Sequence, residues 1–184
     1  MSDWKRLPGR PAYRRGTLRI VEDRWERSDG TRHAFTLVRS PSFAIVVAVT
    51  DEHEVPLVEN LHPSPGLRLI ELPGGHIDPP ETPRAAARRE LEEETGWKAR
   101  RLALLGRYYP NPHWGTYEGH LFFADGLSEG AAHPDPDESI RPFLLPVREV
   151  YRRFRQGKFR AGSAIVALAA AEERFRAMGL LPPR

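Results

Sequence analysis

The sequence predicts an α+β fold in which a mixed β-sheet lies between helices, an α/β/α sandwich. Segments rich in β-branched and aromatic residues dominate the first two thirds of the chain, and one helix-forming segment, residues 83–95, is embedded among them. Two amphipathic segments, residues 147–155 and 163–178, are expected to close the chain as helices. At 184 residues, of which 40% are hydrophobic, the chain is long enough to bury one sizeable core.

The expected strands begin with an N-terminal β-hairpin. Residues 17–27 and 32–39 are rich in β-branched and aromatic residues, and the turn sequence SDG at residues 28–30 separates them. Residues 43–49, FAIVVAV, form a continuous apolar run of the kind that a buried central strand requires. Further strands are expected over residues 55–61, 67–72, 101–109, 117–127 and 139–146.

Composition restricts the environment and the partners of the chain. It has no cysteine, so disulfides and thiolate metal sites are excluded, and any metal must bind to oxygen or imidazole. It contains neither a signal-peptide pattern nor a run of about 20 apolar residues, so a cytoplasmic protein without a membrane partner is expected. The net charge is only +3, with basic and acidic residues interspersed. This pattern is only weak evidence for nucleic-acid binding, and a basic lining for an anionic small molecule explains it as well. No nucleic-acid partner is expected.

The helix at residues 83–95 has clear start and stop signals. Thr82 is a suitable N-cap, and Pro83 occupies the first helical position, where its missing N–H group costs nothing. Gly96 is placed to end the helix in a left-handed conformation. The segment is therefore expected to form a short helix between two glycine-containing loops.

This helix places three carboxylates beside its apolar stripe. Glu90 and Glu94, four residues apart, lie at one edge of the stripe, and Glu93 lies on the other side of Glu90, whereas Glu92 points to solvent. Like charges at a half-buried surface repel and resist desolvation, so a cation must compensate them.

Two kinds of cation are considered. Arginine side chains of the same helix are one alternative. The other is a divalent ion, because the preceding loop, ELPGGHIDPPE, brings backbone carbonyls close to the glutamates. Carboxylate and carbonyl oxygens are the ligands that Mg²⁺ prefers, and a site of open coordination can polarise a phosphate and activate water.

The same stretch resembles the signature of the Nudix hydrolases, G-x5-E-x7-R-E-U-x-E-E-x-G-U, where U is a bulky apolar residue. All nine specified positions are filled, by Gly75, Glu81, Arg89, Glu90, Leu91, Glu93, Glu94, Gly96 and Trp97. Trp97 departs from the usual aliphatic residue, which concerns packing. The resemblance implies a sheet between helices, with an N-terminal extension and hairpin at residues 1–40 and a Nudix hydrolase domain at residues 41–184. It also implies Mg²⁺-dependent hydrolysis of a nucleoside diphosphate linked to another group, with Mn²⁺ as a possible substitute.

The resemblance also implies roles for individual residues of the signature. Glu90 and Glu94 become the principal metal ligands, joined by Glu93 and the carbonyl group of Gly74. Glu93 is thus a candidate both as a ligand and as a catalytic residue.

Three other positions have catalytic or supporting roles by the same resemblance. Arg89 would orient a glutamate through a charge-assisted hydrogen bond. Glu81 would support the loop or complete the metal shell, and Gly75 would support the loop.

The flanking sequence is similar to the branch of the family that hydrolyses ADP-ribose and nucleoside-diphosphate sugars. Pro112 follows the signature at the spacing of that branch, and Glu118 begins the related strand pattern that ends at Ala124. His62 stands where relatives often carry an arginine. The residues expected to bind substrate are Trp25, Arg27, His62, Pro112, His113, Trp114 and Glu118. The branch further implies a homodimer to which the hairpin contributes, and a monomer that uses the hairpin as a lid is the alternative.

Glu138 lies where this branch places a loop glutamate that acts as general base. Asp135 and Asp137 are neighbours that could serve instead, and a solvated connector explains the same acidic segment. The predicted products are a nucleoside monophosphate and a sugar phosphate. Hydrolysis of nucleoside triphosphates or dinucleoside polyphosphates, and a non-catalytic nucleotide sensor, are the alternative functions.

Overall fold

The computed structural model describes residues 3–133 and 139–183, which form two compact units. The first unit consists of Met1–Ser42 and Tyr109–Glu118, and the second of Phe43–Tyr108 and Gly119–Arg184. The domain boundaries expected from the sequence stay a prediction. In the described part of the chain, no helix is long and apolar enough to span a membrane.

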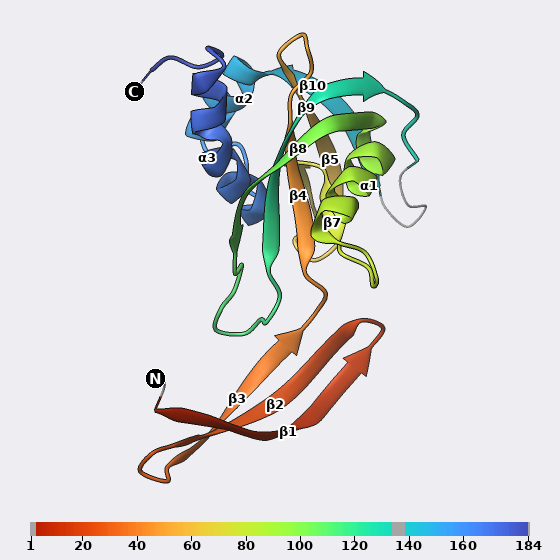
Figure 1. Ribbon diagram of the computed structural model, residues 1–184. Helices are drawn as coiled ribbons and strands as arrows, with labels where there is room; N and C mark the ends of the chain where they lie inside the picture. Colours follow the sequence, from red (N-terminus) through yellow and green to blue (C-terminus); the bar gives the residue numbers. More distant parts are fainter. Residues whose placement is uncertain (1–2, 134–138, 184) are drawn as a thin grey trace. The chain divides into compact units, whose positions relative to one another are not determined.

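The first unit is built on a three-stranded antiparallel sheet in the order β1-β2-β3 (Figure 1). Its strands are β1 (Trp4–Arg15), β2 (Leu18–Arg27) and β3 (Arg32–Arg39). The expected hairpin is the pair β2 and β3, whose residues pair in continuous register from Arg19 with Arg39 to Glu26 with Arg32.

Strand β1 was not expected from the sequence, because Pro8, Gly9 and Pro11 argue against a strand. It is an edge strand in the order of the sheet, where the missing N–H groups of proline are tolerated. Its register to β2 shifts between Leu7 and Arg10, and again after Pro11, so the irregularities fall at the residues that disfavour regular pairing.

The described residues of the second unit form two sheets and three helices. The four-stranded sheet has the order β7-β4-β9-β8, with β4 and β9 parallel and the other pairs antiparallel. The three-stranded sheet has the order β10-β5-β6 and is antiparallel. The strands are β4 (Phe43–Ala48), β5 (Glu54–His62), β6 (Leu67–Glu71), β7 (Gly74–His76), β8 (Trp97–Tyr108), β9 (Gly119–Glu129) and β10 (Ile140–Pro146).

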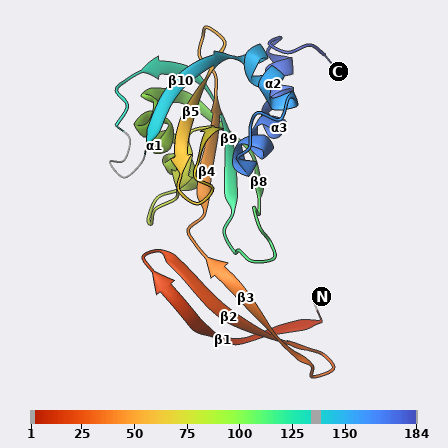
Figure 2. The ribbon, with the colours of Figure 1, turned by 180° about the vertical axis from the view of Figure 1, so that it is seen from behind.

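Strand β4 is covered on both faces, which confirms the sandwich. Ile45 and Val47 belong to the apolar cluster that also contains buried residues of α2 (Val147–Arg155) and α3 (Gly162–Ala177). Val46 and Ala48, which alternate with them, belong to a second cluster that contains residues of α1 (Pro83–Thr95). The two views of the ribbon show α1 on one side of β4 and α3 on the other (Figures 1 and 2). The continuous apolar run of this segment follows from burial on both faces.

Candidate active site

Helix α1 begins and ends at the residues that the sequence indicates. The side chain of Thr82 accepts a hydrogen bond from the backbone N–H of Ala85 at 3.2 Å, and Pro83 follows it directly. Gly96 has a φ of 77° and donates its backbone N–H to the carbonyl of Glu92 at 2.8 Å. These caps fix which turns of the helix carry the glutamates.

The buried stripe of α1 contains a glutamate. Ala86, Ala87 and Leu91 are fully buried, and Glu94, on the same stripe, is only 5% exposed. Its carboxylate accepts the backbone N–H of Gly74 at 2.9 Å. A carboxylate at this depth requires polar partners, and this contact joins the helix to the loop before it.

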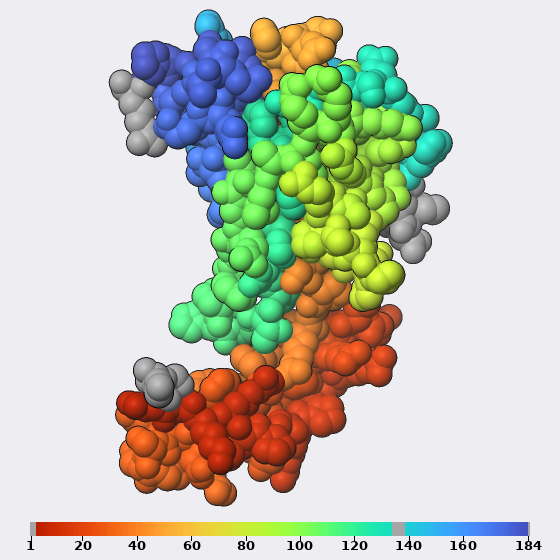
Figure 3. All heavy atoms as spheres, viewed as in Figure 1, coloured from red at the N-terminus to blue at the C-terminus, as the bar shows by residue number. Residues whose placement is uncertain are grey.

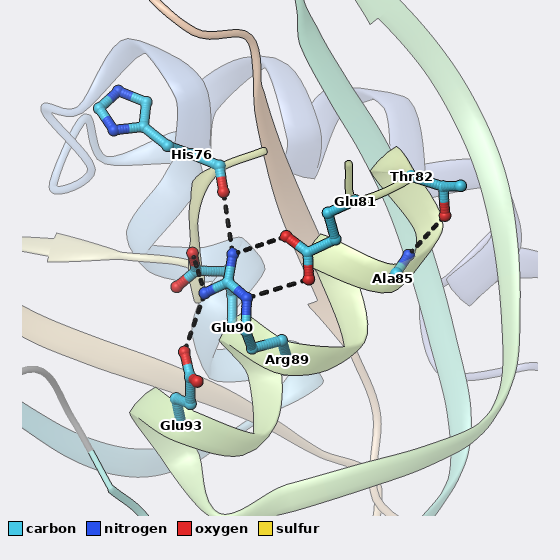
Figure 4. Close-up of polar contacts among 7 residues, drawn as sticks. All are labelled: His76, Glu81, Thr82, Ala85, Arg89, Glu90 and Glu93. Carbon is cyan, nitrogen blue, oxygen red and sulfur yellow. Dashed lines mark hydrogen bonds and ion pairs between the residues drawn. The ribbon is translucent and has the colours of Figure 1, made fainter. Parts of the chain in front are cut away.

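Arg89 holds three carboxylates around one guanidinium group (Figure 4). Its Nε and Nη2 atoms donate to the two oxygens of Glu81 at 3.0 Å each, which is a bidentate pair. Its Nη1 atom donates to Glu90 at 2.8 Å and to Glu93 at 2.9 Å, and Nη2 also donates to the carbonyl of His76 at 3.0 Å. Glu90 and Glu93 therefore already approach one cationic atom.

The ion pair between Arg89 and Glu81 keeps both groups charged. The hydrogen bonds from Arg89 lower the pKa of Glu81 below its ordinary value. The same hydrogen bonds raise the pKa of Arg89, and the contacts with Glu93 and Glu90 raise it further. This group therefore supplies one fixed positive charge among three negative ones.

The two glycines of the loop allow this close approach. A Cβ atom on Gly75 would lie 2.4 Å from an Oε atom of Glu90, and one on Gly74 would lie 2.2 Å from the carbonyl oxygen of Ala44. Both glycines belong to β7, which pairs with β4. Glu90 therefore lies against Gly75, and Glu94 binds the N–H group of Gly74.

The other two arginines of α1 do not compensate the glutamates. Arg84 donates to the carbonyl of Leu102, and Arg88 donates to the carbonyl of Ala99, so both tie the helix to β8. Among the arginines of α1, Arg89 is therefore the one that compensates the charge of the glutamates.

Three of the residues expected to bind substrate gather in the first unit. Trp25, Pro112 and His113 line a cavity of about 430 Å³ together with Trp4, Phe35 and Leu37. The Trp4 ring lies 5.0 Å from that of His33 and 6.1 Å from that of Phe35, both in edge-on geometry. The cavity is therefore predominantly aromatic and apolar.

The remaining predicted substrate residues lie outside this cavity. The guanidinium carbon of Arg27 lies 5.5 Å from the centre of the Trp4 ring. Trp114 is 65% exposed, and Glu118 accepts a hydrogen bond from the hydroxyl of Tyr109 at 2.6 Å. In the second unit, Nε2 of His62 lies 2.7 Å from a carboxylate oxygen of Glu71.

Comparison with known proteins decides the family. Residues 39–164 match the model of the NUDIX domain. The chain belongs to the Nudix family. It is a Nudix hydrolase, as the signature predicts.

This Nudix hydrolase is similar in sequence to the following three relatives and in fold to one solved structure. The methanol dehydrogenase activator of Bacillus methanolicus is 29% identical over 82% of this chain and 83% of its own. The ADP-ribose pyrophosphatase of Bacillus subtilis is 32% identical over 71% of this chain and 76% of its own. The ADP-sugar pyrophosphatase of Mus musculus is 41% identical over 70% of this chain and 62% of its own. The crystal structure of an ADP compounds hydrolase covers 98% of both chains with a TM-score of 0.84 at 20% identity, which shows a shared fold.

The chemistry of the donor set fits the divalent metal that Nudix hydrolases generally use. Glu90, Glu93 and Glu94 supply carboxylate oxygens, which hard divalent cations prefer, and Gly75 leaves the space that Glu90 occupies. Among the described residues, no three acidic or histidine side chains converge as they stand on a point that would hold an ion. Two of these glutamates, Glu90 and Glu93, accept hydrogen bonds from the guanidinium group of Arg89.

Sequence reasoning missed Trp4, Phe35 and Leu37 as neighbours of the predicted residues in the aromatic cavity. The clearest missed signal is the pairing of β1 with β2, which brings Trp4 opposite Arg27. The carbonyl of His76 was also missed as a partner of Arg89, since backbone groups carry no signal in the sequence. Glu138, Asp135 and Asp137 lie outside the described residues.

Proposed function

We propose that this Nudix hydrolase cleaves the pyrophosphate bond of ADP-ribose or a nucleotide sugar in a Mg²⁺-dependent reaction. The products are a nucleoside monophosphate and a sugar phosphate. The observation that carries the proposal is the set of carboxylates on α1, held around Arg89 and against the Gly74–Gly75 pair. The names of the relatives from Bacillus subtilis and Mus musculus support this substrate class.

In the proposed site, Glu90 and Glu94 are the principal metal ligands, and Glu93 and the carbonyl of Gly74 join them. These residues would hold Mg²⁺, which would supply charge neutralisation at the pyrophosphate and activation of water. Arg89 positions Glu90 and Glu93 by charge-assisted hydrogen bonds, and Glu81 in turn holds Arg89. Mn²⁺ is expected to replace Mg²⁺, since both prefer oxygen ligands.

Each of these residues has a separate task in the proposed reaction. The buried carboxylate of Glu94 keeps its place through the N–H group of Gly74 and does not need to move when substrate arrives. Glu93 is the most exposed of the three glutamates that contact Arg89, with 41% of its side chain accessible, so it is the one best able to reach a water molecule. Glu138 stays our proposal for the general base.

The aromatic cavity of the first unit is the proposed binding site for the base of the nucleotide. Trp25 and His113 offer planar rings, and Pro112 and Leu37 offer apolar surface. Aromatic rings bind a purine by stacking, which contributes about 1–3 kcal/mol per base. Arg27, His62, Trp114 and Glu118 stay predicted contacts to the rest of the substrate.

We further propose that the protein forms a homodimer and that it is located in the cytoplasm. A three-stranded sheet needs an apolar face packed on a further layer, and Tyr13 and Leu18, which lie on the same face of this sheet, are exposed. A second copy of this sheet would cover them. The absence of cysteine from the sequence is compatible with a reducing compartment.

The reaction products test the proposed function. We expect ADP-ribose and Mg²⁺ to yield AMP and ribose 5-phosphate, with ¹⁸O from labelled water in one of the two phosphates, because water attacks phosphorus. Nucleotide sugars, dinucleoside polyphosphates and nucleoside triphosphates form the comparison panel, with chromatography and mass spectrometry as the readout. Free ribose with intact ADP would contradict attack at phosphorus, and turnover of triphosphates alone would contradict the substrate class.

Removal of the Trp25 side chain tests the proposed base site. We expect Trp25→Ala to raise KM for ADP-ribose about tenfold with little change in kcat, because stacking acts equally on the bound substrate and the transition state. Leu104→Ala is the comparison variant, since that side chain is half exposed, does not line the cavity and is not among the predicted substrate contacts. Equal effects of the two substitutions on KM would remove the cavity from substrate binding.

A further inference from the structure

A second cavity lies in the second unit, at the end of the chain that carries the two C-terminal helices. It has a volume of about 880 Å³ and is lined by residues of α2, α3 and the segment at residues 179–183. In the ribbon views α2 and α3 lie side by side, and in the space-filling view α3 and the last residues form one continuous blue region of surface (Figures 1, 2 and 3). None of its lining residues belongs to the signature on α1.

Two arginines of α2 are placed on one face of a fixed helix. Arg148 and Arg155 are seven residues apart, which is about two helical turns, so both can line the same cavity. Tyr151, between them, is fully buried and donates its hydroxyl to the carbonyl of Leu168 in α3 at 2.7 Å. The guanidinium of Arg155 lies 6.0 Å from the centre of the Tyr151 ring, which orients it.

The acidic groups around the cavity are already engaged. One oxygen of Glu172 accepts hydrogen bonds from Arg155 at 3.0 Å and from Arg176 at 2.7 Å. Glu173 lies 3.5 Å from Nε of Arg176, and Nη1 of Arg176 donates to the carbonyl of Pro182.

Arg148 has a different position. Its side chain lines the cavity but makes no hydrogen bond or ion pair with the residues described in the structure. The lining of the cavity thus contains three arginines and one glutamate, and Arg148 and the guanidinium atoms of Arg155 other than Nη2 remain available for an anion.

We propose that this cavity binds a small organic phosphate. The phosphate group is held by Arg148 and Arg155, because a guanidinium group matches the oxygens of a phosphate with paired N–H donors. The organic part lies against Leu181 and the neighbouring prolines at 182 and 183. A volume of about 880 Å³ is far larger than a bare phosphate needs and falls within the range of small-molecule sites. The site is separate from the proposed catalytic residues, and the inference does not rest on the proposed function.

Calorimetric titration of the full chain tests this site. Three probes, AMP, ribose 5-phosphate and inorganic phosphate, distinguish a nucleotide from a sugar phosphate and from the free ion, with EDTA present to remove divalent metal. We expect saturable binding of AMP or ribose 5-phosphate that is about tenfold tighter than binding of inorganic phosphate, because of the apolar wall. Equal affinity for all three probes, or no saturable binding, would overturn the proposal.

Substitutions locate the binding. Arg148→Gln is expected to weaken it about tenfold, since one charge-assisted pair is lost, and Arg155→Gln should act in the same direction. Arg160→Gln is the matched control, an exposed arginine that does not line the cavity, and it should change the affinity less than twofold. Thermal melting shows that each variant is folded.

Two variants of the proposed catalytic machinery separate the two sites. Binding of ribose 5-phosphate, which has no base to occupy the aromatic cavity, should persist in Glu94→Gln and in Trp25→Ala, because neither residue lines the cavity at α2 and α3. Loss of binding in either variant, or unchanged binding in Arg148→Gln, would show that the phosphate binds elsewhere and would overturn the inference.

Discussion

Glu94→Gln is expected to retain the fold and to lose turnover by a factor on the order of 10² or more. The side chain of Glu94 is almost completely buried and accepts the N–H of Gly74 at 2.9 Å. Glutamine has nearly the same shape and can still accept this hydrogen bond, so the helix and the loop should stay in place. It lacks the negative charge that a divalent cation requires. Initial rates of ADP-ribose hydrolysis across a Mg²⁺ titration, together with thermal melting, provide the measurement.

Glu92→Gln is the matched control for this prediction. Glu92 lies on the same helix, two residues away, but its carboxylate pairs with Lys98 at 3.1 Å and both side chains are about half accessible, 41% for Glu92 and 55% for Lys98. Exposed pairs of this kind contribute little, so turnover should stay within about twofold of the wild type. Activity of Glu94→Gln close to the wild type at saturating Mg²⁺ would remove Glu94 from the metal site.

Arg89→Gln is expected to reduce turnover about 10- to 100-fold and to lower the melting temperature. Without the guanidinium group, Glu81, Glu90 and Glu93 lose their shared partner and repel one another. Arg89→Lys keeps the charge but cannot form the bidentate pair with Glu81, so its rate and its melting temperature should fall between those of the wild type and Arg89→Gln. A glutamine variant with the stability of the wild type would show that the hydrogen bonds of Arg89 are dispensable.

The same variant should change how stability depends on pH. Because Arg89 lowers the pKa of Glu81 in the folded protein, this pair stabilises the wild type above the unfolded pKa, near 4.5, and the contribution is lost as the pH falls through the folded value. In Arg89→Gln the remaining carboxylates repel one another while ionised, and protonation relieves that repulsion. The stability difference between the two proteins is therefore expected to shrink below about pH 4.5. A difference that grows on acidification would contradict the role of Arg89.

The helix that carries the site could be predicted closely because its signals are local. The N-cap at Thr82, the proline after it and the glycine at residue 96 act on neighbouring backbone groups, and the structure has the helix between them. The face that carries Glu90 and Glu94 follows from the helical period alone.

Contacts between distant residues were harder to predict. Three arginines on α1 are chemically equivalent in the sequence, yet Arg84 and Arg88 bind carbonyls of β8 and only Arg89 binds glutamates. Which arginine binds the glutamates depends on the position of β8 beside α1, and local sequence signals do not determine that position.

For strand β1, the local sequence signals lead to the wrong prediction. Its prolines disfavour a strand, but pairing with β2 along one edge of a sheet outweighs that preference. Because β1 was not foreseen, neither was the position of Trp4 beside Trp25 in the aromatic cavity.

The most direct test of the central claim is a titration of Mn²⁺ followed by electron paramagnetic resonance, which measures metal binding without turnover. The claim is that the carboxylates of α1 hold a divalent cation. We predict saturable binding by the wild type and by Glu92→Gln, and binding weakened about tenfold or more in both Glu90→Gln and Glu94→Gln. Equal binding of Mn²⁺ by all four proteins would contradict the claim.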